Sequence, residues 1–194
     1  PRHTGSMLFM DALFNSLLVV SSGYAMYTLH PVQTPYGYTA AALSLVHGLL
    51  GVVRAANNDD DECNRLRQIT SGIMELVPLP LTNIELYLKS SSPHLAMAHG
   101  CFLVPLAFDI VAKWRDIEDN STVTLKDLTL LGNVVSLLFL GVNQANNVYG
   151  AMAALAFGAR YGSVLFDYFE GLGVHINLMA NSAFIVLMAM TLTA

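Results

Sequence analysis

The chain has 194 residues, of which 54% are hydrophobic and 12% are charged, and its net charge is −5 at pH 7. A soluble globular domain typically carries about 25% charged residues, because its surface needs them for solubility. This composition favours an integral membrane protein over a soluble helical bundle, and no basic surface argues for a nucleic-acid partner. Residues 1–6 have the character of an expression-tag remnant, so we expect residues 7–194 to form a single transmembrane helical domain.

Seven segments of the chain are apolar and long enough to cross a bilayer, which takes about 20 residues in a helix. Clusters of proline and polar residues separate them, as expected at turns, and none of these clusters has the character of a flexible interdomain linker. The sequence therefore predicts an all-α, polytopic helix bundle. The predicted spans are residues 8–29, 37–54, 69–88, 94–113, 127–144, 148–166 and 173–193.

The third segment, residues 69–88, is the ambiguous one, because it contains Glu75 and Glu85 together with Pro78 and Pro80. Proline has no backbone N–H, so we expect a break or a kink in the helix just after Glu75. An interrupted span exposes backbone groups that can bind ions or polar substrates where protein shields them from lipid. A kink that serves only helix packing is the alternative.

The distribution of Lys and Arg favours a crossing by this segment. If residues 69–88 cross, six loop cations lie on one side of the membrane and only Lys89 lies on the other. Positive loops stay in the cytoplasm, so we predict a cytoplasmic amino terminus on the side of the six cations. These six are Arg54, Arg65, Arg67, Lys113, Arg115 and Lys126.

Polar and ionisable residues recur along the predicted spans. Such groups are costly in hydrocarbon and usually face the interior of a bundle or a water-filled cavity. We therefore predict a cavity for a substrate or an ion, lined from several spans. Its candidate residues are His47, Glu75, His99, Asp109, Asn143, Arg160 and Asn177. The alternative is that these side chains only form hydrogen bonds between helices.

Arg160 lies in the middle of a predicted span and needs an acidic partner there. A guanidinium at the membrane midplane costs at least about 2.5 kcal/mol on insertion scales. Glu75 is our first choice of partner because we place it at a comparable depth, and Asp109 is the second. We also expect Asn177 and Asn181, one helical turn apart, to form a polar seam against a neighbouring helix.

Three histidines, His47, His99 and His175, fall on three different predicted spans. A zinc site needs several ligands that converge, and the sequence contains neither an HExxH motif nor a histidine pair at chelating spacing. We therefore expect no metal and no cofactor. The sequence also lacks the motifs of a nucleophile elbow, a phosphate-binding loop and a dinucleotide-binding fold.

A short internal similarity links two of the predicted spans. Residues Tyr36 to Ala41 and Tyr149 to Ala154 share four of six residues, and His47 then falls in register with Arg160. Two triplets of spans around a fourth would form a parallel 3+1+3 repeat, an arrangement that transporters use.

These observations support three functional hypotheses. The first is a small transporter or channel-like protein that moves a small solute, an ion or a lipid through the polar cavity. The second is an accessory or scaffold subunit whose polar residues only hold helices together. The third is an integral membrane enzyme that acts on lipid. The expected partners are the lipid bilayer, the unknown solute, and either a second copy of the chain or a partner membrane subunit.

Overall fold

The computed structural model describes residues 2–56, 61–115, 117, 120–170 and 172–194, and these residues are almost entirely helical. In chain order the elements are α1 (Arg2–Thr28), α2 (Pro35–Ala56), α3 (Asp61–Leu76), α4 (Pro78–Leu88), η1 (Pro93–Phe102), α5 (Leu103–Trp114), α6 (Asn120–Asn143), α7 (Asn147–Phe157), η2 (Gly158–Gly162), α8 (Ser163–Glu170) and α9 (Gly173–Thr193). They form seven rods within the described residues, because α3 leads into α4, η1 into α5, and α7 through η2 into α8. The predicted all-α bundle is confirmed.

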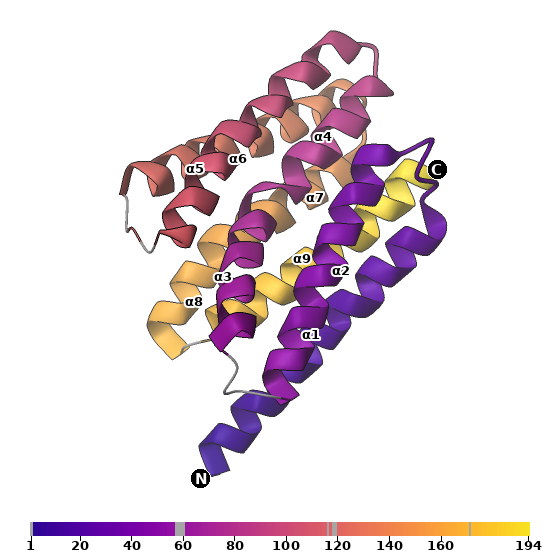
Figure 1. Ribbon diagram of the computed structural model, residues 1–194. Coiled ribbons are helices and arrows are strands. Elements are labelled where there is room, and N and C mark those ends of the chain that lie inside the picture. The colour runs from indigo at the N-terminus through magenta and orange to yellow at the C-terminus, as the bar shows by residue number, and fades with distance from the viewer. Residues whose placement is uncertain (1, 57–60, 116, 118–119, 171) are drawn as a thin grey trace.

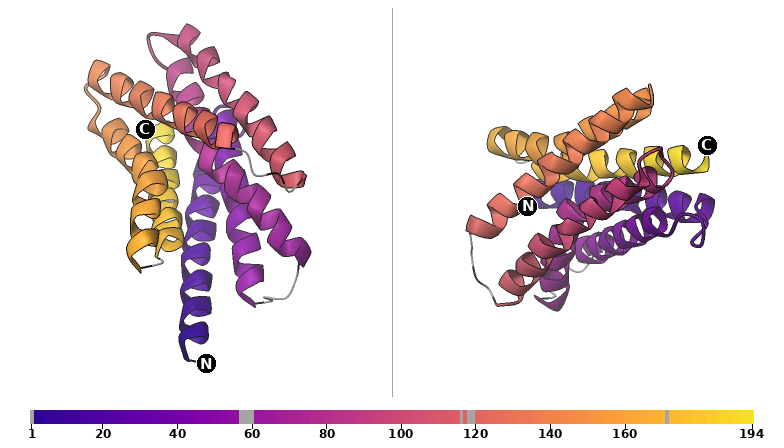
Figure 2. Two further views of the ribbon diagram at one scale, coloured as in Figure 1. Left: turned by 90° about the vertical axis from the view of Figure 1, so that its left-hand side faces the viewer. Right: turned by 90° about the horizontal axis from the view of Figure 1, so that it is seen from above.

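Successive rods run in opposite directions (Figure 1). The amino terminus and the ends of α2 and α8 lie at one end of the molecule, and the carboxyl terminus and the α1–α2 turn lie at the other. The rod α6 is strongly tilted relative to α1 and α9 (Figure 2). Its first half consequently lies near α3 and α5, and it also packs against α7.

Five helical stretches in the described residues have the length and apolar composition to cross a membrane. They are Leu8–Thr28, Pro35–Ala56, Pro93–Trp114, Ser121–Asn143 and Gly173–Thr193. The other two predicted spans are each interrupted. The third changes from α3 to α4 at Val77, and the sixth contains the π-helical turn η2. Of the seven predicted spans, all seven are present as helical rods, and five of these are candidate membrane spans. Membrane crossing by the third and the sixth stays a prediction.

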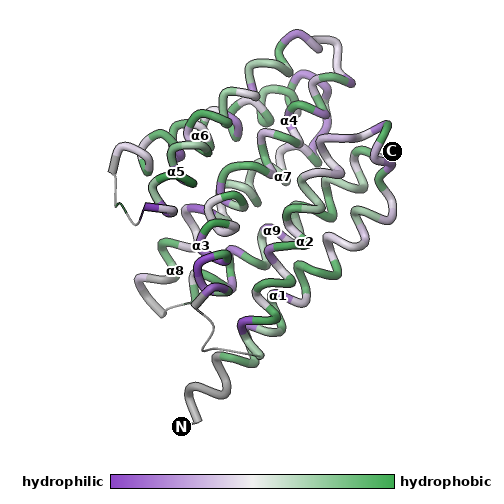
Figure 3. Tube along the Cα trace, in the orientation of Figure 1, coloured by the Kyte–Doolittle hydropathy of each residue, from purple (hydrophilic) through white to green (hydrophobic). Residues whose placement is uncertain are grey.

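The exterior of the bundle is largely apolar. On α6, for example, Leu128, Val135, Phe139 and Val142 are each more than half exposed. Figure 3 shows hydrophobic residues along the rods, with hydrophilic residues gathered near the ends of α2, α3 and α5. A continuous apolar exterior would be unfavourable in water and is suited to contact with lipid. The chain is therefore a multi-pass membrane protein.

The short helix α4 forms the centre of the bundle, and every residue from Pro78 to Tyr87 is buried. Its Glu85 carboxylate accepts hydrogen bonds from the backbone N–H groups of Tyr36 and Gly37, at 2.8 and 3.2 Å. These N–H groups lie in the first turn of α2, where a helix favours a negative charge. Glu85 therefore caps α2.

Small residues allow α1 and α2 to pack closely. A side chain at Gly48 would place its Cβ 3.2 Å from the backbone oxygen of Asn15, and Ala40 and Ser44 on the same face are buried. This face is a tight packing surface, as its four-residue spacing indicates. The suggested repeat is not shown, because α2 runs unbroken whereas the matching rod is interrupted after Phe157.

Candidate functional site

A polar cleft opens between α1, α2, α3, α8 and α9. It has a volume of about 430 Å³, and eight of its twelve lining residues are polar or charged. Cavities that bind small ligands commonly measure a few hundred Å³. The lining residues are Asp11, His47, Arg54, Arg67, Ser71, Glu75, Ser163, Val164, Gly173, Val174, Asn177 and Leu178.

A second, much smaller cavity lies further inside the bundle. Its volume of about 20 Å³ leaves room for roughly one water molecule. Glu75 and Asn177 line both the cleft and this inner cavity, while Arg160, Asn181 and Pro78 line the inner cavity alone. Glu75 and Asn177 consequently stand between the two spaces.

The break in the third rod lies directly beside the inner cavity. The helix α3 ends at Leu76 and α4 begins at Pro78, with a bend at Val77, as the two prolines predict. Because Pro78 and Pro80 lack N–H groups, the carbonyls of Met74 and Leu76 lose the donors that a regular helix would provide. The break therefore places Glu75 in the last turn of α3, where backbone carbonyls are released from the helical pattern.

The π-helical turn η2 places Arg160, and the sequence analysis missed it. Turns of this kind are rare and frequently occur at functional sites. Ser163 donates a hydrogen bond to the Arg160 carbonyl at 2.8 Å, and Asn177 donates one to the Ala159 carbonyl at 2.8 Å. These side chains satisfy carbonyls within the interruption. The predicted polar seam is found in part: Asn177 contacts the neighbouring rod through Ala159, whereas Asn181 donates to the Asn177 side chain of its own helix at 2.9 Å.

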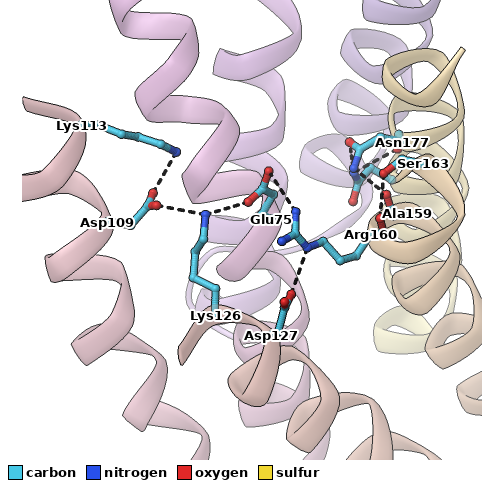
Figure 4. Close-up of polar contacts among 10 residues, drawn as sticks. Glu75, Asp109, Lys113, Lys126, Asp127, Ala159, Arg160, Ser163 and Asn177 are labelled. Atoms are coloured by element: carbon cyan, nitrogen blue, oxygen red, sulfur yellow. Dashed lines mark hydrogen bonds and ion pairs between the residues drawn. The ribbon is translucent and has the colours of Figure 1, made fainter. Parts of the chain in front are cut away.

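Six charged residues form a continuous network of ion pairs (Figure 4). They are Glu75, Asp109, Lys113, Lys126, Asp127 and Arg160. Lys126 occupies the middle, with its Nζ 2.9 Å from Glu75 and 3.0 Å from Asp109. Asp109 also contacts the Nζ of Lys113 at 2.9 Å. Three acids and three bases cancel in charge, so the network is neutral as a whole.

Arg160 joins this network through two acids. Its Nη1 lies 3.8 Å from Glu75 Oε1, and its Nε donates to Asp127 Oδ1 at 3.1 Å. The predicted pairing with Glu75 is confirmed, but the shorter, hydrogen-bonded contact is with Asp127. We placed Asp127 at the very start of a span, whereas α6 begins at Asn120 and so carries Asp127 two turns into the helix.

A separate set of polar residues lies at the mouth of the cleft. Arg67 Nη1 donates to Asn15 Oδ1 at 3.3 Å, and His175 Nε2 lies 2.8 Å from Asp11 Oδ1. Burial and, secondly, the nearby Arg54 guanidinium lower the pKa of Arg67 below its ordinary value. The two arginines therefore lie close enough to repel each other.

Four of the seven predicted cavity residues lie at the two spaces just described. His47, Glu75 and Asn177 line the cleft, and Arg160 lines the inner cavity. Asp109 lines neither space and is linked to Glu75 through Lys126, which contacts both acids. Asn143 is exposed at the end of α6 and lies apart from both spaces. Sequence reasoning missed Arg54 and Arg67, which we assigned to loops from their charge.

His99 belongs to a different polar group on the α6 side of the bundle. Its Nδ1 lies 2.7 Å from Asn133 Oδ1, and its Nε2 lies 3.2 Å from the Ser136 hydroxyl. Asn133 Oδ1 also accepts from Asn83, so Nδ1 of a neutral His99 is the donor. The Ser136 hydroxyl donates to the Tyr87 hydroxyl at 2.8 Å. These residues line an open groove of about 340 Å³.

These contacts run from Ser136 to His99 to Asn133, which is the order of residues in a hydrolase triad. Ser136, however, lies within α6, where backbone N–H groups are used by the helix and cannot form an oxyanion hole. Tyr87 also donates to the Ser136 carbonyl at 3.0 Å. We therefore interpret the group as a polar link between α4, η1 and α6.

Comparison with known proteins places the chain in a family. The profile of a family described as Domain of unknown function (DUF4791) matches residues 31–192, which is most of the chain. The chain belongs to the DUF4791 family. The DUF4791 region begins after α1, so it contains Glu75, Arg160 and both arginines of the cleft but excludes Asp11. No curated protein and no solved structure matches the chain.

Proposed function

We propose that this protein is a small transporter or channel-like protein, and that the cleft is the entry for a small polar solute or ion. The observation that carries the proposal is the polar cleft of about 430 Å³ that ends at Glu75 and Asn177 inside an otherwise apolar bundle. Polar space within membrane helices is costly and usually serves a substrate or ion pathway.

The same observation assigns a role to Glu75 and Arg160. The path narrows from the cleft to the inner cavity at Glu75, and beyond it lie the buried apolar residues Leu79, Leu130 and Phe184. In this proposal the cleft is the open side of the path, at the end that carries the amino terminus. Interrupted helices flank the narrowing on two sides, and transporters commonly form their substrate and ion sites at such interruptions. We propose that the Glu75–Arg160 pair is the closed gate.

A second function, that of a scaffold subunit, is favoured by one specific observation. The network around Glu75 is neutral, and each of its members contacts an opposite charge. Such a network holds α3, α5, α6 and η2 together without any ligand. The two functions differ in the state of the cleft, which is wet in a transporter and dry in a scaffold buried by its partner.

Cysteine accessibility distinguishes the two. Cys63 and Cys101 both carry thiols that the reagent could modify, so the background carries Cys63→Ser and Cys101→Ser. Single cysteines then replace Ser71 and Ser163 in the cleft, and Ser182, which is buried in α9, serves as the dry control. In membranes, we expect a charged methanethiosulfonate reagent to modify the two cleft cysteines from one side only and to spare the control.

Protection of both cleft cysteines in membranes, with modification after denaturation, would contradict the transport proposal. A flux measurement then follows in proteoliposomes. Solid-supported-membrane currents are recorded with protons, sodium, potassium, chloride and phosphate, for the native protein and for Glu75→Gln. Transport through the path requires a current with at least one of these ions that the substitution at Glu75 reduces.

A further inference from the structure

We propose that the mouth of the cleft is an oxyanion site, in which Arg54 and Arg67 hold a phosphate-type group. This inference rests on the proposed function in one respect, which is that the cleft admits a solute. It adds the chemical class of that ligand. The shared chemistry is a tetrahedral oxyanion, supplied either as a free phosphate or sulfate or as the headgroup of an anionic lipid.

The charge of the cleft lining supports this inference. Two acids line the cleft, and both are already paired with other residues. Glu75 lies 2.9 Å from Lys126 and also contacts Arg160, while Asp11 lies 2.8 Å from a nitrogen of His175. A neutral His175 does not cancel the Asp11 charge, and Asp11 also attracts Arg67. With Glu75 neutralised in its network, the described lining therefore sets the two guanidinium groups of Arg54 and Arg67 against the single carboxylate of Asp11, which leaves it with an excess of positive charge.

The hydrogen-bond donors of these arginines are mostly unused. A guanidinium has five N–H donors, and the only hydrogen bond of the Arg67 side chain within the described residues goes to the neutral Asn15. Arg54 has no ion pair or hydrogen bond to a described residue, although it lines the same cleft. Arg54 is exposed and Arg67 is half-buried, so these donors are free to meet a ligand in the open cleft. An oxyanion would give them charge-assisted hydrogen bonds, which are stronger than those to water.

The neighbouring groups fit an oxyanion. Arg54, Arg67 and Ser71 line not only the cleft but also an adjoining hollow of about 410 Å³, together with Asn64 and Gln68. Ser71 follows Arg67 by one helical turn, so its hydroxyl lies on the same face of α3. Two planar guanidinium forks and one hydroxyl match the several oxygens of a phosphate better than the two of a carboxylate.

Repulsion between the arginines points to the same ligand. Arg54 and Arg67 line the same cleft and the same adjoining hollow, so their equal charges repel each other, and Asp11 offsets this repulsion only in part. An anion bound between them removes this cost and adds charge-assisted hydrogen bonds. A cation or a neutral sugar would do neither, so the lining selects for negative charge.

The binding test uses the full chain in nanodiscs of phosphatidylcholine, titrated with inorganic phosphate and with sulfate by isothermal calorimetry. We expect saturable binding that weakens by at least about tenfold in the double variant Arg54→Gln, Arg67→Gln, because each lost charge-assisted bond contributes more than 1 kcal/mol. The matched control is Arg65→Gln, Arg115→Gln, which removes the same charge; Arg65 hydrogen-bonds to the exposed Trp114 carbonyl instead.

A second arm distinguishes the source of the oxyanion. Nanodiscs that contain phosphatidic acid are compared with pure phosphatidylcholine. If the headgroup is the ligand, phosphatidic acid displaces inorganic phosphate and co-purifies with the native protein but not with the Arg54, Arg67 double variant. If free phosphate is the ligand, phosphatidic acid leaves its affinity unchanged.

Asp59 and Asp60 follow Arg54 in the sequence and lie outside the described residues. The titration is therefore repeated with both replaced by asparagine. The inference is overturned if neither the native protein nor this asparagine variant binds phosphate, sulfate or phosphatidic acid. It is also overturned if the Arg54, Arg67 double variant binds as well as the Arg65, Arg115 control. Cleft accessibility and ion flux are measured separately, so this failure leaves the transport proposal standing.

Discussion

At the scale of single residues, the Arg160 site shows how a buried charge chooses its partners. A guanidinium between helices requires compensation, and two acids provide it. Glu75 also has Lys126 as a partner, whereas Arg160 is the only cation that contacts Asp127 within the described residues. Loss of Arg160 therefore isolates Asp127 more than Glu75.

We accordingly expect Arg160→Leu to destabilise the protein by about 1–3 kcal/mol. This is less than the cost of breaking a fully buried ion pair, because the Arg160 and Asp127 side chains are both partly exposed. The double change Arg160→Leu, Asp127→Leu should recover part of this loss, since no unpaired carboxylate remains. Reversible unfolding in mixed detergent micelles measures both. Equal destabilisation by the single and double changes would show that the two charges are not coupled.

Gly72 is required where α3 meets α5. A Cβ at this position would collide with the Asp109 carboxylate and the Lys113 ammonium, which form an ion pair against the glycine. The Lys113 side chain is flexible and can turn away, but Asp109 is held by Lys126 at 3.0 Å on its other oxygen, so a larger residue displaces Lys113 and costs the Asp109–Lys113 ion pair.

Gly72→Ala should consequently lower stability by about 1–3 kcal/mol, the usual cost of overpacking. Gly150→Ala is the control, because no atom lies within 4 Å of the added carbon in the described structure. Thermal unfolding followed by circular dichroism compares the two. A similar melting temperature for both variants would mean that the α3–α5 contact is looser than the structure shows.

At the scale of elements, the interrupted rods surround the narrow part of the path. The bend at Val77 ends the turn that carries Glu75, and η2 contains Arg160 itself. Interruptions concentrate where the charges are, because irregular backbone within a membrane is tolerated only where protein or water shields it.

The prolines of the third rod are open to a direct test. The double change Pro78→Ala, Pro80→Ala restores two backbone donors and favours a continuous helix. We expect it to preserve helical content, measured by circular dichroism, and to abolish the Glu75-dependent current in proteoliposomes. A normal current in the double variant would assign the prolines to packing alone.

At the scale of the whole molecule, the arrangement of the rods agrees with the charge distribution. Rods alternate in direction, so α2 terminates at the end of the molecule that carries the amino terminus (Figure 1). The connections at residues 57–60 and 118–119 lie outside the described residues. Of the cations that flank them, Arg54 lies in the last turn of α2 and Arg115 follows the last residue of α5. The orientation in the membrane remains a prediction from the positive-inside rule.

Epitope tags inserted at residues 60 and 118 should accordingly be digested when protease is added to the cytoplasmic side of sealed membranes, whereas a tag at residue 91 should be protected. The sequon at Asn120 would face the cytoplasm and stay unmodified. Glycosylation at Asn120, assessed by a mobility shift after glycosidase treatment, would contradict this orientation.

The sequence by itself determined those features that follow from local chemistry. Low charge and long apolar segments indicate membrane helices, Pro78 and Pro80 indicate the break after Glu75, and the cost of a buried charge requires a partner for Arg160. Each of these depends on residue types and their spacing along the chain. None depends on how the helices are rotated.

Only the tertiary structure decided which polar residues meet. Successive residues of a helix point about 100° apart, and tilt changes the depth of each side chain, so small differences in rotation select different neighbours. This is why Asp127 is the closer partner of Arg160, why His99 joins a separate group with Asn133, and why Asn143 lies apart. The π-helical turn and the cleft arise from the packing of several rods, which no single segment encodes.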